Sequence, residues 1–382
     1  MTNPLLELKA LGQSVWLDDI DRGQLRSGQF GRLVDDDGLA GATGNPTIFE
    51  HAITHGTTYD EQMQQLFQED KDPKEIYEAL AMTDERTVAD LLRPLYERTN
   101  GQDGLVSIEV SPYLAHDTAG TLAEVRRFWR AIDRPNLMVK IPSTAAGLPA
   151  IRQALVEGIN INITLIFSLA NYRQVAGAYL DALEVRLAAG KDISHIASVA
   201  SFFVRRVDVL VDTLLADRIY ASGQSGQSRE SGERQKLESL QGKAAIANAR
   251  LAYQEFKGLF TSPRFAALKQ RGVHVQRPLW ASTGAKNPAY RDVLYVEELI
   301  GPDTVNTMPL TTIERFREHG RVRYSIEDNL PLAQGDLAGL EDVGIHYDQV
   351  TGQLQEEGVQ KFIDSFQKLF ECIESKRKEL PS

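Results

Sequence analysis

The sequence predicts one α/β domain, a closed (β/α)8 barrel, and three observations lead to this fold class. Eight short apolar runs recur along the chain, and each ends in small or polar residues. Segments with helical periodicity separate these runs, and strands that alternate with helices pair in parallel through right-handed crossovers. The chain has 382 residues, of which 42% are hydrophobic, and this is enough for a single barrel with extra helices.

The predicted strands are short apolar runs that stop at polar or turn-forming residues. They lie at residues 14–18, 39–43, 105–110, 137–141, 159–167, 195–200, 273–281 and 304–307. In a parallel barrel the carboxyl ends of all strands meet at one mouth, where the functional site of this fold lies. The polar residues that end these runs are therefore expected to share one site.

Helical periodicity predicts the elements between the strands. Residues 59–98 are rich in Glu, Gln, Leu and Ala and predict two helices. The segment 168–189 begins with Ser168, a residue type that favours the N-cap position of a helix, and residues 202–221 continue the helical pattern. Residues 221–235 are instead polar and rich in glycine and serine. They predict a flexible surface loop, with a lid over the site as the alternative.

A long C-terminal helix is predicted over residues 354–379. Within it Val359, Phe362, Phe366 and Phe370 fall on one helical face. An apolar face of this kind usually packs against the rest of the fold. We expect it to lie on the outside of the barrel or to cover part of its mouth.

Composition and charge exclude several functional classes. The formal net charge is −11, from 53 acidic and 42 basic residues, whereas nucleic-acid binding needs a basic face. No apolar stretch is long enough to span a membrane, and the N-terminus lacks a basic region followed by an apolar segment. Cys372 is the only cysteine, so no disulfide can form within the chain. We expect a cytoplasmic monomer or homodimer.

Lys140 is the residue that points most directly to a chemical function. It lies in the apolar run Asn136–Pro142, which predicts a buried strand that stops at the proline. Burial removes hydration from an ammonium group, and a lysine that loses its proton can attack a carbonyl to form a Schiff base. A lysine at a strand end can also simply reach solvent. The functional interpretation therefore depends on the other residues at the predicted mouth.

Further polar residues at the strand ends would complete Schiff-base chemistry that breaks a carbon–carbon bond. Glu109 could supply the proton that carries water away from the carbinolamine, with that water held by Thr164. Asp18 could take a proton from the hydroxyl beside the bond that breaks, and its neighbour Asp19 is the alternative base. A sugar phosphate could bind through its hydroxyls to Asn45, Asn162 and Ser201, and through its phosphate to Arg206, Ser282 and Lys286.

On these residues the chain resembles the transaldolases, specifically their longer bacterial type. The stretches that carry the resemblance are spread over about the first 320 residues. They are Trp16–Asp18, Gly44–Phe49, Ser107–Pro112, Met138–Thr144, Gly158–Ser168, Ala200–Arg206 and Arg277–Lys286. The match is loosest in the last stretch. There the shorter members have a serine and a nearby arginine, and this chain has Ser282 and Lys286.

The resemblance implies a class I aldolase-like barrel that transfers a dihydroxyacetone unit in the non-oxidative pentose phosphate pathway. The donor would be sedoheptulose 7-phosphate or fructose 6-phosphate, and the acceptor glyceraldehyde 3-phosphate or erythrose 4-phosphate. The resemblance gives Lys140 the Schiff base, Glu109 the acid–base role, Thr164 the water-holding role and Asp18 the proton abstraction. It matches Arg206 to a phosphate-binding arginine. It implies no cofactor and no metal, and sugar phosphates as the partners.

Other functions fit these residues less well. A fructose 6-phosphate aldolase is similar but releases free dihydroxyacetone, and such enzymes tend to hold the catalytic water with a tyrosine and a glutamine. This chain has Glu109 and Phe203 instead, which favours the transferase. A non-catalytic sugar-phosphate-binding protein would not need Lys140, Glu109 and Asp18 together. The seven histidines are scattered without metal-binding spacing, which disfavours a metal-dependent aldolase.

Overall fold

The computed structural model describes residues 3–18, 20–44, 46–222 and 230–380. In this part of the chain eight parallel strands pair in sequence order, and the last strand pairs with the first to close a barrel. The predicted fold class is thereby confirmed. The strands are β1 (Gln13–Leu17), β2 (Gly41–Thr43), β3 (Leu105–Glu109), β4 (Leu137–Pro142), β5 (Ile161–Ile166), β6 (Ser198–Phe203), β7 (Arg277–Ala281) and β8 (Thr304–Met308).

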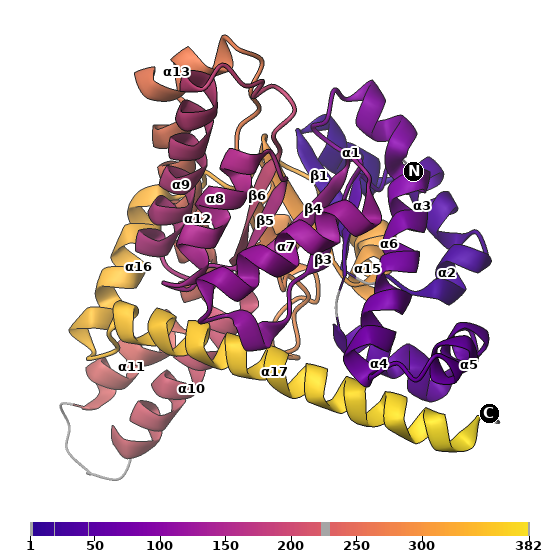
Figure 1. Cartoon of the computed structure of the whole chain (residues 1–382). Coiled ribbons are helices and arrows are strands. Elements are labelled where there is room, and N and C mark those ends of the chain that lie inside the picture. Colours follow the sequence, from indigo (N-terminus) through magenta and orange to yellow (C-terminus); the bar gives the residue numbers. More distant parts are fainter. Residues whose placement is uncertain (1–2, 19, 45, 223–229, 381–382) are drawn as a thin grey trace.

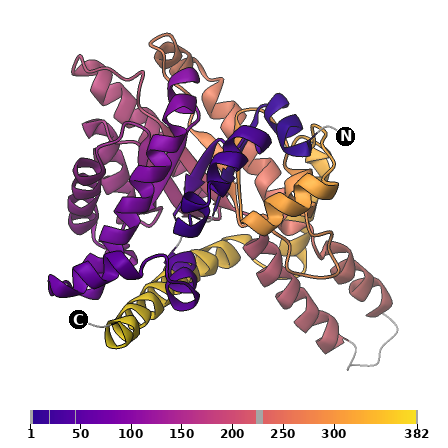
Figure 2. The same cartoon turned by 90° about the vertical axis from the view of Figure 1, so that its right-hand side faces the viewer.

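Helices surround the barrel, as Figure 1 and Figure 2 show from two directions. Residues 59–98 form two helices and Ser168 caps the helix that follows it, as the sequence predicts. The helices are α1 (Pro4–Ala10), α2 (Arg22–Arg26), α3 (Gln29–Asp37), α4 (Pro46–His55), α5 (Asp60–Gln68), α6 (Pro73–Arg98), η1 (Pro112–Leu114), α7 (Thr118–Ile132), α8 (Gly147–Glu157), α9 (Leu169–Ala188), α10 (Arg205–Ser222), α11 (Glu230–Leu240), α12 (Ala244–Phe260), α13 (Pro263–Lys269), α14 (Leu294–Glu298), α15 (Leu310–His319), α16 (Leu330–Asp342) and α17 (Tyr347–Glu379).

The sixth strand lies later in the chain than the predicted range 195–200. β6 pairs with β7 up to the partners Phe202–Trp280 and Phe203–Ala281, so the ladder continues through the two phenylalanines that the sequence placed in a helix. Ser201 therefore lies within the strand and not after it. The helix that follows begins at Arg205.

The segment predicted as a surface loop, residues 221–235, overlaps two helices. α10 continues to Ser222 and α11 begins at Glu230, while residues 223–229 lie outside the described residues. The described parts of α10 and α11 project away from the barrel in both views (Figure 1 and Figure 2).

The C-terminal helix α17 crosses the mouth of the barrel. It begins at Tyr347, before the predicted start at residue 354, and its 33 residues run along one side of the molecule in yellow (Figure 1). It contacts the end of β5 and the elements α4, α10 and η1, which follow other barrel strands. No helix in the described ranges is both long and apolar enough to cross a membrane.

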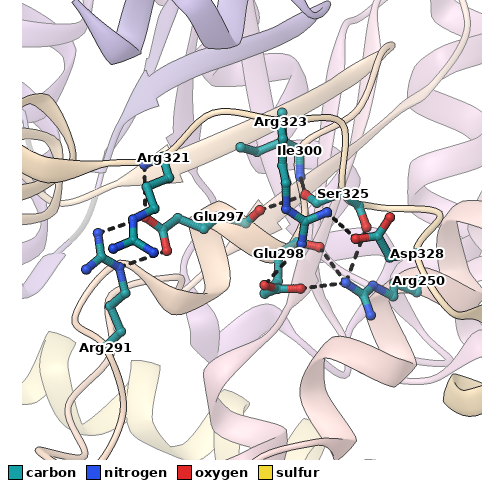
Figure 3. Close-up of polar contacts among 9 residues, drawn as sticks. All are labelled: Arg250, Arg291, Glu297, Glu298, Ile300, Arg321, Arg323, Ser325 and Asp328. Carbon is teal, nitrogen blue, oxygen red and sulfur yellow. Dashed lines mark hydrogen bonds and ion pairs between the residues drawn. The ribbon is translucent and has the colours of Figure 1, made fainter.

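An ion-pair network fastens the segment between α15 and α16 to the helices beside it (Figure 3). Arg250 of α12 and Arg323 both pair with Glu298 of α14, at 2.6 and 3.4 Å. The Ser325 hydroxyl donates to the carbonyl of Glu297 at 2.6 Å. These contacts hold α14, which precedes β8, against α12 and the segment before α16.

Candidate active site

A cavity of about 230 Å³ opens at the carboxyl ends of the strands, beneath α17. It brings together most of the residues that the sequence predicts for the site, although they are spread over the length of the chain. Those that line it are Asp18, Glu109, Lys140, Thr164, Ser201, Arg206, Ser282 and Lys286. Asn45 and Asp19 lie outside the described residues, and Asn162 does not line the cavity.

Lys140 and Glu109 form a buried ion pair in the cavity. They are register partners on the neighbouring strands β4 and β3, so their side chains leave the sheet on the same side. The Nζ atom of Lys140 lies 3.1 Å from Oε2 of Glu109, and the two residues are only 7% and 5% exposed. Burial raises the pKa of the Glu109 carboxyl, and the positive charge of Lys140 opposes this rise. Glu109 is therefore suited to exchange protons with groups attached to Lys140.

Asp18 is the second carboxylate of the cavity and directly follows β1. The hydroxyl of Thr43, at the end of β2, donates to Oδ1 of Asp18 at 2.8 Å, and it lies 3.3 Å from the hydroxyl of Thr307 on β8. Burial raises the pKa of Asp18, while nearby Lys140 and the Thr43 hydrogen bond counteract this. Asp18 is thus oriented by a neighbouring strand, and it lies close enough to the Lys140–Glu109 pair to interact with both charges.

Thr164 lies at a local irregularity of β5. The pairing register with β6 shifts between Ile163 and Ile166, and Leu165 has a φ of 59°, a left-handed conformation that is costly for a leucine. The Thr164 side chain lines the cavity, and its buried hydroxyl oxygen has no hydrogen-bond partner among the described residues. A buried hydroxyl of this kind is available to bind a ligand or a water molecule.

Asn162 is buried in β5 and is not among the residues that line the cavity. It is the register partner of Lys140 on β5 and is fully buried. Its amide nitrogen donates to the hydroxyl of Ser107 at 3.1 Å, and its oxygen accepts from Ser201 at 2.7 Å. Asn162 therefore holds Ser201, which does line the cavity, and contributes to the floor of the site through it.

The side of the cavity formed by the residues that follow β6 and β7 carries further positive charge. Arg206 stacks on the ring of Phe203, with the guanidinium carbon 5.1 Å from the ring centre. Its neighbour Arg205, which was not selected from the sequence, donates to the carbonyl of Gly284 at 2.6 Å and also lines the cavity. Ser282 has a φ of 61°, so the turn after β7 is tight at this point. Two guanidinium groups and Lys286 at this side suit a phosphate group.

Several residues that line the cavity were not predicted from the sequence as contributors to the site, and four of them carry a polar or aromatic side chain close to the predicted residues. These four are Thr43, Arg205, Thr307 and Phe362. The first three end a predicted strand or adjoin a selected residue, so strand-end position was an available signal. Phe362 belongs to α17. The apolar face of this helix was predicted from the sequence, but the surface that this face covers was not.

The geometry suits a reaction in which an amine attacks the carbonyl group of a substrate while the cationic side of the cavity binds an anionic group of the same substrate. The cavity holds the Lys140 amine, two carboxylates with different surroundings, and the cationic side formed by Arg205, Arg206 and Lys286. Within the described ranges no group of three or more His, Cys, Asp or Glu side chains is placed to hold a metal ion.

Comparison with known proteins leads to the same assignment as these residues. The family model described as transaldolase/fructose-6-phosphate aldolase matches residues 15–373. The chain is 44% identical over 382 residues to a protein named Transaldolase from Trichodesmium erythraeum, covering 100% of this chain and 99% of that protein. It is 47% identical over 374 residues to Transaldolase from Acidothermus cellulolyticus, covering 98% and 96%. The chain therefore belongs to the transaldolase/fructose-6-phosphate aldolase family.

Proposed function

We propose that the protein is a transaldolase, which moves a dihydroxyacetone unit from a ketose phosphate to an aldose phosphate through a Schiff base on Lys140. The observation that carries this proposal is the buried Lys140 amine, 3.1 Å from Glu109 and in one cavity with Asp18. The names of the full-length relatives support it.

The first stage is formation of the Schiff base. The Lys140 amine attacks the ketose carbonyl to give a carbinolamine, and the hydroxyl of this intermediate must leave as water. Glu109 is placed beside the amine to deliver the proton that this departure needs. We assign Thr164 to hold the water through which the proton passes, because its hydroxyl faces the cavity and is buried.

The second stage breaks and remakes the carbon–carbon bond. Asp18 removes the proton of the neighbouring hydroxyl, the bond breaks, and the cationic imine accepts the electron pair as the aldose phosphate leaves. The three-carbon unit stays on Lys140. It then adds to the carbonyl of an acceptor aldose phosphate, Asp18 returns the proton, and hydrolysis of the imine frees the new ketose phosphate.

The phosphate of each substrate would bind at the cationic side of the cavity, to Arg206, Ser282 and Lys286. Ser201 and Asn45 would bind sugar hydroxyls, and Asn162 would position Ser201. Sedoheptulose 7-phosphate or fructose 6-phosphate would be the donor, and glyceraldehyde 3-phosphate or erythrose 4-phosphate the acceptor. These substrates belong to the non-oxidative pentose phosphate pathway.

Fructose 6-phosphate aldolase activity is the alternative, since the matching family includes it. That reaction would release the three-carbon unit as free dihydroxyacetone. The pairing of Lys140 with the carboxylate Glu109 and the presence of Phe203 favour transfer. A measurement of free dihydroxyacetone with and without an acceptor aldose phosphate separates the two reactions.

The proposed function is tested by trapping the covalent intermediate. Fructose 6-phosphate is added, the imine is reduced with borohydride, and the modified peptide is mapped by mass spectrometry. We expect the adduct on Lys140 and none in a Lys140→Arg variant, because a guanidinium remains protonated and forms no imine. Modification of Lys286, the other lysine that lines the cavity, would contradict the proposal, and so would the absence of any adduct.

A further inference from the structure

Phe362 is a cavity residue for which the proposed mechanism gives no task. It is the one α17 residue that lines the cavity. Its ring lies over the reacting amine, with the Nζ atom of Lys140 5.6 Å from the ring centre. The other aromatic ring of the cavity, Phe203, packs against Arg206 and Phe167. Phe362 therefore covers the nucleophile from the side opposite to the barrel floor.

Contacts on both sides of the mouth fix the position of α17. Near its start, the Tyr347 hydroxyl accepts from the backbone N–H of Leu169 at 3.0 Å. Near its end, Lys376 pairs with Asp60 of α5 at 3.9 Å. The helix is thus supported at both ends, and its middle crosses the mouth.

The middle of α17 is held by the strand ends themselves. The amide of Gln355 donates to the carbonyl of Leu165 at 3.2 Å and lies 3.3 Å from the carbonyl of Ser143. Gly358 lies against the Leu165 side chain so closely that an added Cβ would come within 2.9 Å of it. Phe362 follows Gln355 by seven residues, two helical turns, so both side chains face the mouth.

A transferase must protect its three-carbon covalent intermediate from water until the acceptor has added, although water must later release the new ketose phosphate. After cleavage, Lys140 carries the three-carbon unit as an imine in equilibrium with its enamine. Attack of one water molecule on the imine carbon breaks the carbon–nitrogen bond. The water oxygen becomes the carbonyl oxygen of free dihydroxyacetone, and its two protons pass to the lysine nitrogen and the solvent-exchangeable groups, which restores the Lys140 amine. Exclusion of water from the site suppresses side reactions of this kind.

We propose that Phe362 is a specificity-determining residue that covers the Lys140 intermediate and makes an aldehyde, and not water, its acceptor. This inference rests on the proposed transaldolase function. A phenyl ring beside the nitrogen has no hydrogen-bonding group with which to hold a water molecule in line with the imine carbon. The face of the ring also favours the positive charge of the protonated imine.

The test measures how the intermediate divides between its two acceptors. Fructose 6-phosphate is supplied with erythrose 4-phosphate, and free dihydroxyacetone and newly formed ketose phosphate are both quantified. For Phe362→Ala we expect the ratio of free to transferred product to rise by about tenfold or more, as removal of the ring lowers the barrier to hydrolysis. Phe362→Leu keeps an apolar cover, and its ratio of free to transferred product should stay near that of the wild-type protein.

Phe370→Ala is the matched control. It removes the same ring from the same helix, where Phe370 packs against Phe366 at 5.7 Å and does not line the cavity. Its product ratio should be unchanged even if the helix is less stable. An unchanged ratio in Phe362→Ala, or an equal rise in Phe370→Ala or Phe362→Leu, would overturn the inference. Failure of the unchanged protein to transfer the three-carbon unit would overturn the proposed function instead.

Discussion

At the scale of single residues, the two carboxylates of the cavity are held in ways that suit different steps. Glu109 faces the Lys140 amine directly, at 3.1 Å. Asp18 instead accepts a hydrogen bond from Thr43 at 2.8 Å, so one of its oxygens is oriented by β2. Glu109 should therefore act where bonds to the lysine nitrogen change, and Asp18 where the substrate hydroxyl loses its proton.

Asp18→Asn is expected to trap the enzyme as a covalent intermediate. The amide keeps an oxygen that can accept from Thr43 but cannot take a proton from the substrate. Cleavage should slow by about 10²–10⁴-fold, the usual cost of losing a positioned base, while imine formation continues. Borohydride quenching at successive times, read by mass spectrometry, would show the donor adduct accumulating on Lys140.

Glu109→Gln provides the contrast to that variant. Because Glu109 lies beside the amine, its loss should slow formation of the adduct itself, and little intermediate should accumulate at any time. Normal cleavage by Asp18→Asn, or its failure to form the adduct, would show that the base is misassigned. Asp19 would then be the next candidate.

Much of the residue-scale site could be predicted because barrel geometry sends strand-end residues to one place. Lys140 and Glu109 follow from this rule, because each lies at the end of an apolar run and the predicted barrel brings those ends to one mouth. Asn162 shows the limit of the rule. Alternation places it on the same side as Thr164, but side chains within a barrel lie in layers, and depth decides which layer meets the cavity. The sequence pattern carries no information on depth.

At the scale of elements, α17 is the part of the site that the sequence specified least. Its apolar face was predicted, yet a stripe of phenylalanines packs equally well on any apolar surface. The docking is instead determined by two small features, Gln355 at the strand-end carbonyls and Gly358 against Leu165. Such pairings join residues about 190 positions apart, and no local pattern reveals them.

The docking of α17 on the barrel mouth can be tested by replacing either of two of its glycines with alanine. Gly352 has open space around its Cα, so Gly352→Ala should stabilise the protein by about 0.5–1 kcal/mol through helix propensity alone. In Gly358→Ala the same gain is opposed, because the new methyl group would lie 2.9 Å from a side-chain carbon of the buried Leu165. Thermal unfolding of both variants measures the difference. Equal stabilisation by both would show that the middle of α17 is not tightly packed on the mouth.

Element boundaries were less predictable than element types. The helical pattern predicts a helix from residue 202, three residues before α10 begins, because Phe202 and Phe203 suit a strand or a helix equally and only pairing with β7 decides between them. The start of α17 was placed too late because the residues from Tyr347 onward are mostly polar. In both places, partners distant in sequence decide the conformation, as is usual where local propensity is weak.

At the scale of the whole molecule, the barrel is the part that the sequence predicted best. Alternating strands and helices allow few topologies, and parallel pairing in sequence order closes the sheet when eight units are present. Contacts between the outer helices are harder to foresee. One of these contacts is made by a buried carboxylate, that of Asp208 on α10. It accepts from the backbone N–H of Ala245 on α12 at 2.7 Å and from the hydroxyl of Tyr295 on α14 at 2.8 Å.

Asp208 should make the stability of the whole molecule depend on pH. Burial, reinforced by nearby Asp212, raises the pKa of Asp208 to about 7 from 3.8. Between about pH 4 and pH 7 the folded protein therefore binds a proton that the unfolded chain has lost. The free energy of unfolding must then fall as pH rises through this range, by at most roughly 4 kcal/mol, and the loss is complete above pH 7.

Asp208→Asn should remove this dependence. The amide can accept from the Ala245 N–H and donate to the Tyr295 oxygen, so the contacts between the three helices are kept without a titrating group. Urea unfolding from pH 4.5 to 8 should show the variant gaining stability relative to the unchanged protein as pH rises, with a plateau above pH 7. Asp217→Asn, on the exposed side of the same helix, should give a curve parallel to that of the unchanged protein. If the Asp208→Asn curve is also parallel, Asp208 is ionised throughout this range and another group must offset the cost of its burial.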